Sequence, residues 1–308
     1  MAPLDAIART SLLTAALRAK ETERPDRLYE DPLAARLVGA LGSDLLGQVA
    51  DASGPRHTDP GQGGPGQGGP GQGGPGHDVP GQKVPSTVDF NAIRTRYFDD
   101  YLLTQVTDGG YPQVVMVAAG MDTRAYRLPW TRPVELFELD RPGVLEAKES
   151  ALGDEPVRQR VTRRPIGVDL LGPDWTDALV TAGYRPEEPS LWLLEGLLYY
   201  LTDDEARQLL SRVADLAAPG SRIAADMVSA TTLTAPAVAP LLEVFERQGC
   251  PWLSGHDEPE ALFAEYGIEA EAVQPGEESA HYGRWPDPVH PRHVPDVERV
   301  FLVHGVRK

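Results

Sequence analysis

The chain is poor in cysteine, in basic residues and in long apolar runs, and each shortage excludes a class of protein. Its 308 residues include one cysteine, Cys250, which cannot form an internal disulfide. The 46 acidic residues outnumber the 29 basic ones, and the formal net charge of −17 disfavours binding to nucleic acids and to anionic membranes. No apolar run approaches the roughly 20 residues that a membrane-spanning helix needs.

The first residues, MAPLDAIARTSLL, lack the cationic start, apolar core and cleavage site of a signal peptide. Together with the single cysteine, this predicts a soluble, cytoplasmic protein. We expect neither a nucleic-acid nor a membrane partner, and we predict no metal site. The length suffices for one large domain or two small ones with a substantial core.

Glycine is missing where a dinucleotide-binding loop needs it. The string AAGMDTR has alanines at 118 and 119, and no glycine lies between Gly120 and Gly143, so the fingerprint G-x-G-x-x-G is absent. A pyrophosphate would be poorly held, and neither YRLPW nor YYLTD supplies a Tyr-x-x-x-Lys pair. Both absences count against an NAD(P)-dependent oxidoreductase, which we keep as the alternative enzyme class. A non-catalytic binding protein is the third class.

A proline- and glycine-rich repeat interrupts the chain. Prolines recur every five residues from 55 to 85, with three copies of GQGGP at 61–75 and the degenerate copies GHDVP and GQKVP after them. Collagen needs glycine at every third residue and is excluded. Because the segment has too little apolar surface to offset its ordering entropy, we predict that 52–86 is a flexible loop. A low-complexity insertion is favoured over a lid or a docking segment.

The remaining sequence alternates between helical and strand patterns. We expect helices at 4–20, from the Asp31-Pro32 pair onward, and at 88–103. The expected strands are 114–118, 134–138, 164–167, 191–194, 222–226, 268–273 and 299–306. This order predicts an α/β fold with a doubly wound, seven-stranded, mostly parallel sheet in which the last two strands form an antiparallel pair. Residues 1–51 then form an N-terminal helical cap, and 87–308 form the core with a lid segment at about 229–266.

Four polar signals stand at the ends of successive expected strands, where an open α/β sheet binds its ligands. Gly120 allows the backbone close to a ligand, although a tight turn would also use it. Asp140, twenty residues later, can accept both ribose hydroxyls of a nucleoside, and a solvated acid is the alternative.

The third and fourth strands end in acidic residues as well. Asp169 and Leu170 suit an adenine pocket, with an Asx turn or a helix cap as an equal competitor. Glu195 follows a buried strand and needs a cationic partner, either a ligand's amino or sulfonium group or one of Arg94 and Arg96.

These residues occur in a characteristic set of strings: residues 10–37, RTRYFDDYL, AAGMDTRAYRL, FELDRPGVLEAK, VDL and LEGLLYYL. In them the chain resembles the leucine carboxyl methyltransferase-like branch of the class I S-adenosylmethionine-dependent methyltransferases, and in particular the actinobacterial small-molecule O-methyltransferases. The resemblance implies a Rossmann-like fold and S-adenosyl-L-methionine as cofactor. The repeat, and AAG in place of GAG or GCG, depart from the family pattern.

The resemblance also implies roles for individual residues. Gly120 would lie against the methionine part of the cofactor, and Asp140 would hold the ribose. Asp169 and Leu170 would frame the adenine, and Glu195 would contact the amino-acid end. The remaining transferred contacts are basic residues: Arg96 for the cofactor carboxylate, with Arg94 as the alternative, and Lys20 from the N-terminal segment.

The function predicted on this basis is methyl transfer to a carboxylate or a hydroxyl of a small molecule, such as an aromatic or polyketide-like natural product. A carboxylate acceptor is already ionised at neutral pH, whereas a phenol has to lose a proton. Leu241, Leu242, Phe245 and Trp252 can form an apolar wall for the acceptor, although packing of the lid is the simpler interpretation. The sequence indicates no catalytic base. It allows a homo-oligomer but does not determine the oligomeric state.

Overall fold

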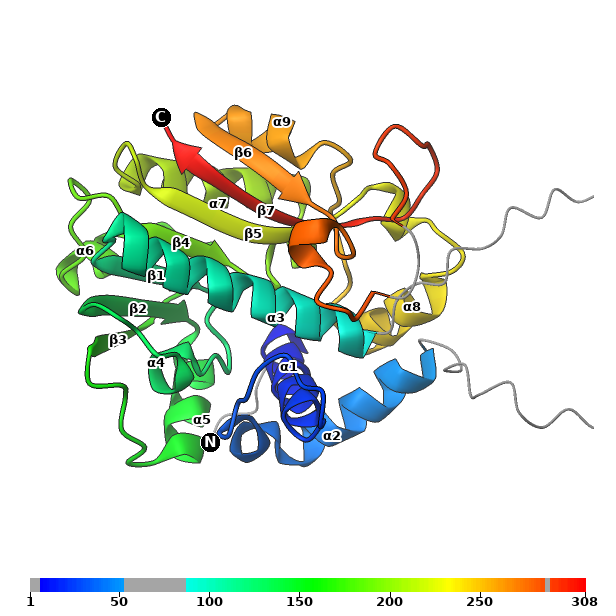
Figure 1. Ribbon diagram of the computed structural model, residues 1–308, viewed down its shortest axis with the longest axis horizontal. Coiled ribbons are helices and arrows are strands. Elements are labelled where there is room, and N and C mark those ends of the chain that lie inside the picture. Colours follow the sequence, from blue (N-terminus) through cyan, green and yellow to red (C-terminus); the bar gives the residue numbers. More distant parts are fainter. Residues whose placement is uncertain (1–5, 53–86, 286–288) are drawn as a thin grey trace, which may run out of the picture.

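One seven-stranded sheet organises the chain. The computed structural model describes residues 6–52, 87–285 and 289–308. The strands lie in the order β3-β2-β1-β4-β5-β7-β6 (Figure 1), which confirms the expected fold class. They are β1 (Gln113–Val117), β2 (Val134–Asp140), β3 (Val161–Gly167), β4 (Leu191–Leu194), β5 (Arg222–Val228), β6 (Ile268–Val273) and β7 (Val300–Arg307).

Strand directions bring several carboxyl ends to the same edge of the sheet. Strands β1 to β5 run parallel, while β7 is antiparallel to both β5 and β6. The order changes direction at β1, between β2 on one side and β4 on the other. A crevice for a ligand is expected at that point, outside the carboxyl ends of the strands.

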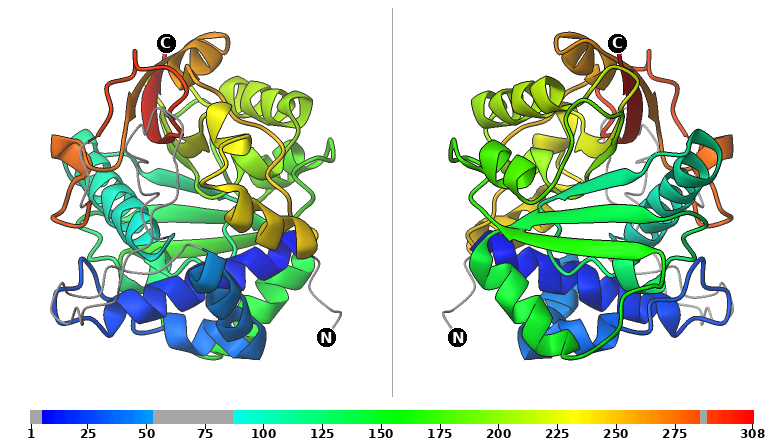
Figure 2. Two further views of the ribbon diagram at one scale, coloured as in Figure 1. Left: turned by 90° about the vertical axis from the view of Figure 1, so that its right-hand side faces the viewer. Right: turned by 90° about the vertical axis from the view of Figure 1, so that its left-hand side faces the viewer.

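Helices cover both faces of the sheet. In Figure 2, α3 lies on one side and α6 and α7 lie on the other, with α1 and α2 crossing one end. The helices are α1 (Ala6–Thr22), α2 (Ala34–Ala52), α3 (Thr87–Thr104), α4 (Arg124–Arg127), α5 (Pro142–Leu152), α6 (Trp175–Thr181), α7 (Asp203–Leu216), α8 (Ala239–Arg247) and α9 (Pro259–Ala264). Short 3-10 turns occur at Leu198–Tyr200, Thr231–Leu233 and Glu278–Ala280, and a π turn extends α3 over Gln105–Gly109.

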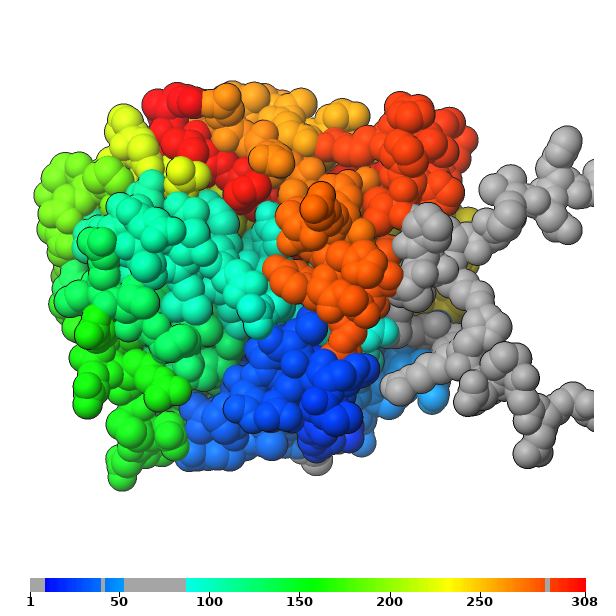
Figure 3. Space-filling model, in the orientation of Figure 1, coloured from blue at the N-terminus to red at the C-terminus, as the bar shows by residue number. Residues whose placement is uncertain are grey.

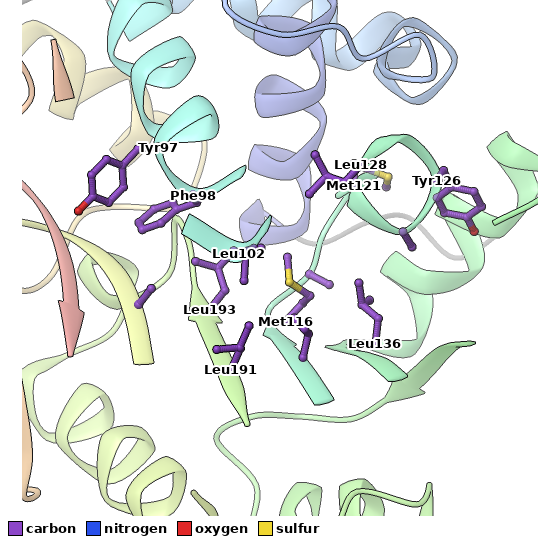
Figure 4. Packing of buried hydrophobic residues seen from close by; sticks show 14 of the residues in the cluster. Tyr97, Phe98, Leu102, Met116, Met121, Tyr126, Leu128, Leu136, Leu191 and Leu193 are labelled. Carbon is purple, nitrogen blue, oxygen red and sulfur yellow. The ribbon is translucent and has the colours of Figure 1, made fainter. Parts of the chain in front are cut away.

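The core has two layers because successive strand residues point to opposite faces of the sheet. Val114 and Met116 of β1 pack in the layer under α3, whereas Val115 and Val117 pack in the layer under α7. Figure 4 shows the first layer, including Phe98 of α3. Every β1 side chain is buried, as expected for a strand covered on both faces.

The N-terminal helices contact residues that are distant from them in the sequence. Arg284 donates a 2.8 Å hydrogen bond from Nη2 to Oε1 of Glu21 at the end of α1, and both side chains are buried. In the space-filling view, the orange segment that contains this arginine lies against the blue N-terminal helix (Figure 3). The cap therefore packs as part of the same body as the sheet.

Two expected boundaries are corrected by the structure. The second helix begins at Ala34 and not beside Pro32, although Oδ1 of Asp31 does accept hydrogen bonds from the backbone nitrogens of Leu33 and Ala34. Strand β3 begins three residues before the expected start at Arg164, because it is an edge strand whose polar side chains hide its pattern. The repeat predicted to be flexible lies almost entirely outside the described residues. None of the helices in the described ranges has the length and apolar character needed to span a bilayer.

Candidate functional site

The turn after β1 is held by a carboxylate from the end of β2. Gly120 has a φ of 52°, and its amide donates a 2.6 Å hydrogen bond to Oδ2 of Asp140. The amide of Arg141 donates a 2.7 Å bond to the other oxygen, Oδ1. Burial raises the pKa of Asp140, and the two amides offset only part of that effect. A partly buried carboxylate with one amide on each oxygen retains acceptor capacity for a ligand.

The residues after β3 form an Asx turn, which is one of the roles that the sequence allows for Asp169. Oδ1 of Asp169 accepts a 3.0 Å hydrogen bond from the amide of Leu171, as in an Asx turn. Asp169 and Leu170 nevertheless line the same cavity as Asp140. The turn and the pocket are therefore compatible roles for Asp169.

Glu195, at the end of β4, has protein partners for its charge. Its Oε1 accepts a 3.0 Å hydrogen bond from Nε of Arg94, and its Oε2 lies 2.7 Å from Nη1 of Arg124. Burial alone would raise the pKa of Glu195, but the two guanidinium groups lower it. The carboxylate is thus ionised inside the fold, at the edge of the cavity.

Asp226 of β5 completes the environment of Arg94. It accepts a 2.8 Å hydrogen bond from Nη1 of Arg94 and a 2.6 Å bond from the amide of Gly196. Tyr199 accepts a further bond, of 3.2 Å, from the same Nη1. Two carboxylates therefore contact one guanidinium where α3, β4 and β5 meet.

A second arginine, Arg124, extends this network, and the strand-end pattern in the sequence indicates no role for it. Its Nε donates a 2.7 Å hydrogen bond to Oδ1 of Asp99 on α3, and its Nη1 contacts Asp122. Arg127 binds the same Asp99 through both terminal nitrogens. The signal for them lies in AGMDTRAYRL and RTRYFDDYL, since each string combines acidic and basic residues beside expected buried elements.

Two predicted basic contacts lie away from the cavity. Arg96 bonds to Asp100 and to the carbonyl of Leu28, and Lys20 pairs with Glu23 at the surface. Neither lines the cavity, whereas Arg94 and Arg18 do. Of the two arginines of the RTR string, the structure thus brings Arg94 to the strand ends.

Two adjoining cavities occupy this end of the sheet. The first, of about 310 Å³, is lined by Gly120, Asp140, Asp169, Leu170 and Glu195. The second, of about 120 Å³, is lined mainly by apolar and aromatic side chains. Both cavities share the lining residues Thr10, Thr14, Arg94, Tyr199 and Tyr200.

The fold and these strand-end residues define the class as a Rossmann-like α/β protein of the class I methyltransferase type. A solved structure of a DUF574 family protein from Streptomyces avermitilis superimposes with a TM-score of 0.59 at 14% identity, over 96% of this chain and 97% of that one. A protein from Thermobifida fusca, whose name places it among the methyltransferases, gives 0.57 at 18% identity, over 94% and 96%. At these identities the likeness concerns the fold alone.

Sequence comparison identifies the family. The model of the leucine carboxyl methyltransferase family matches residues 11–214, and the chain belongs to this family. A Parafrankia protein whose name assigns it to the S-adenosyl-L-methionine-dependent methyltransferases is 40% identical over 71% of this chain, and a Mycobacterium avium protein named for the same class is 38% identical over 72%. The matches span 62% and 67% of the lengths of those relatives.

Proposed function

We propose that this chain is an S-adenosyl-L-methionine-dependent methyltransferase that methylates an oxygen atom of a small molecule. One observation carries the proposal: carboxylates from three strand ends, Asp140, Asp169 and Glu195, surround one cavity of about 310 Å³. A nucleoside with a cationic amino-acid arm matches that arrangement in charge and in the order of its groups. Family membership supports the same cofactor.

The residues of the larger cavity fit the cofactor group by group. In this proposal Asp140 accepts the ribose hydroxyls, and Asp169 with Leu170 binds the adenine. Gly120 keeps the turn free of a side chain, because a Cβ there would lie 2.9 Å from Cβ of Ser11. Glu195 faces the amino end, and Arg94 takes the carboxylate in place of Arg96.

The smaller cavity is the proposed acceptor site. Leu241, Phe245 and Trp252 line it, as the apolar-wall hypothesis requires, whereas Leu242 does not. When bound, the cofactor supplies an electrophilic methyl group on a sulfonium. The chain's own contribution is alignment, since Thr10, Thr14 and Tyr199 border both cavities and so lie where donor and acceptor would meet.

Titration calorimetry with S-adenosylhomocysteine, NAD⁺ and NADP⁺ tests the cofactor. We expect micromolar binding of S-adenosylhomocysteine alone. The Leu170→Ala variant should bind it more weakly, because Leu170 is a proposed contact of the adenine. Binding of a nicotinamide nucleotide instead would favour the oxidoreductase alternative, against which the missing fingerprint glycines argue. Binding of none would favour a non-catalytic protein.

We further propose that the protein acts in the cytoplasm on a small molecule and not on a nucleic acid. The net charge of −17 and the single, buried Cys250 support this. Sedimentation of the purified chain would decide whether it forms a homo-oligomer.

A further inference from the structure

Few of the described residues that line the smaller cavity are charged. Within the ranges that the structure describes, the only charged lining residues are Arg94, Glu298 and Arg299. The aromatic side chains pack closely: Phe245 stacks on Trp252 with ring centroids 5.5 Å apart, and Tyr199 contacts Trp252 at 4.8 Å. An apolar, ring-containing molecule suits such a wall.

Arg94 is not available as a cation for an anionic acceptor, because in the proposed function it already binds the cofactor carboxylate. Its side chain is 5% exposed and already pairs with Glu195 and Asp226, at 3.0 and 2.8 Å. With the cofactor carboxylate bound as a third anion at Arg94, an acceptor carboxylate would be a fourth and would meet an excess of negative charge. Like charges at this distance, out of water, repel strongly.

Arg299, the other guanidinium, is bound to the backbone through its two terminal nitrogens, whereas its buried Nε has no hydrogen-bond partner among the described residues. Its Nη1 donates to the carbonyl of Val297, and its Nη2 donates to the carbonyls of Pro291 and Val294. Its neighbour Glu298 also lines the cavity, so the pair adds no net positive charge.

The remaining polar groups in the lining are neutral. Asn91 is 3% exposed, and its Oδ1 has no hydrogen-bond partner among the described residues. Burial raises the pKa of both Tyr199 and Tyr200, which therefore stay protonated at neutral pH. A ligand hydroxyl can donate to such an amide oxygen, whereas a carboxylate cannot.

We infer that the acceptor is a neutral hydroxyl on an apolar aromatic molecule and not a carboxylate, despite the family's name. This inference rests on the proposed methyltransferase function and decides between the two acceptors it leaves open. In the transfer, the acceptor oxygen bonds to the methyl carbon as the carbon–sulfur bond breaks and its electron pair stays on sulfur. The hydroxyl proton passes to water, so the products are a methyl ether and the thioether.

A matched pair of probes tests the inference directly. The full chain is saturated with S-adenosylhomocysteine and titrated at pH 7 with 2-naphthol and with 2-naphthoate, which share a ring system and differ in the acceptor group. We expect 2-naphthol to bind at least tenfold more tightly. Equal or tighter binding of 2-naphthoate, or no binding of either probe at millimolar concentration, would overturn the inference.

The Asn91→Leu variant tests whether the preference for 2-naphthol arises in the smaller cavity. It replaces the amide with an apolar group of the same branched shape, and Asn91 does not line the larger cavity. The affinity for 2-naphthol should fall about fivefold, as for loss of one hydrogen bond. The affinity for S-adenosylhomocysteine should not change. If the variant does not fold, the comparison of the two probes on the unaltered chain still decides.

A chemical readout separates this inference from the function on which it rests. The chain is incubated with methyl-labelled S-adenosylmethionine and mixtures of phenols or of aromatic acids, and the products are treated with mild alkali. Alkali-stable label supports the hydroxyl, because ethers resist hydrolysis. Alkali-labile label would overturn the inference and leave the methyltransferase proposal intact. Failure to bind S-adenosylhomocysteine at all would instead remove the proposed function.

Discussion

Nε of Arg94, on α3, donates a 3.0 Å hydrogen bond to Oε1 of Glu195, which follows β4. The two residues are 101 positions apart in the chain, and both line the larger cavity. The bond ties the helix before the sheet to the strand end where we propose that the cofactor's amino-acid arm binds. Arg124 and Arg94 together lower the pKa of Glu195 and so keep it ionised in its largely buried environment.

A conservative change at Arg94 should weaken cofactor binding, whereas the same change two residues later should not. Lysine keeps the charge but cannot contact Glu195 and Asp226 through a fork of donors. We expect the dissociation constant for S-adenosylhomocysteine to rise about tenfold in Arg94→Lys. In the control, Arg96→Lys, it should stay within about twofold of the unaltered chain. If calorimetry showed weaker binding by Arg96→Lys and unchanged binding by Arg94→Lys, Arg96 would be the residue that binds the cofactor carboxylate.

Removing the carboxylate of Asp140 should cost cofactor affinity. Its two oxygens accept the amides of Gly120 and Arg141, and it is the proposed ribose ligand. Asp140→Ala should weaken binding of S-adenosylhomocysteine by about 1.5–3 kcal/mol, the range for losing a charged hydrogen-bonding group. The exposed Asp174, which makes no side-chain cap bond, gives the control Asp174→Ala. An unchanged dissociation constant in folded Asp140→Ala would contradict the ribose assignment.

Two glycines near the strand ends should respond oppositely to alanine. At Gly120, φ is 52° and a Cβ would lie 2.9 Å from Cβ of Ser11, so Gly120→Ala should lower the free energy of unfolding by about 1–3 kcal/mol. At Gly143, in α5, a Cβ would have no neighbour within 4 Å. Gly143→Ala should therefore be neutral or stabilise by up to about 1 kcal/mol. Urea unfolding of both variants measures the difference, and equal effects would contradict the argument.

Stability should fall in acid partly through Asp122. Although burial raises its pKa, Arg124 and further cations lower it to about 2 in the folded chain. Because the unfolded value is near 3.9, the ionised group contributes stability above about pH 4 that is lost as the pH falls toward 2. Asp122→Asn should flatten the dependence of the unfolding free energy on pH in that window. Parallel curves for the variant and the unaltered chain would exclude this contribution.

The sequence by itself determined the sheet and the residues at its strand ends. Strand β4 is buried at all four positions and appears in the sequence as an uninterrupted apolar run, so Glu195 after it was identifiable. Asp140 and Asp169 were found in the same way. These are local signals, because a strand buried on both faces needs apolar residues throughout and a polar residue marks where it ends.

Only the tertiary structure decided which basic residues reach the cavity. Arg94 and Arg96 are two residues apart on α3, and about 200° of helix rotation therefore separates them. The packing of Ile93, Phe98 and Leu102 against the sheet sets that rotation and turns Arg94 toward Glu195 and Asp226. The pairing of Arg124 with Asp99 was equally hidden, since it joins α4 to a residue of α3 that lies 25 positions earlier in the chain. Such contacts depend on the relative placement of whole elements, which no local pattern encodes.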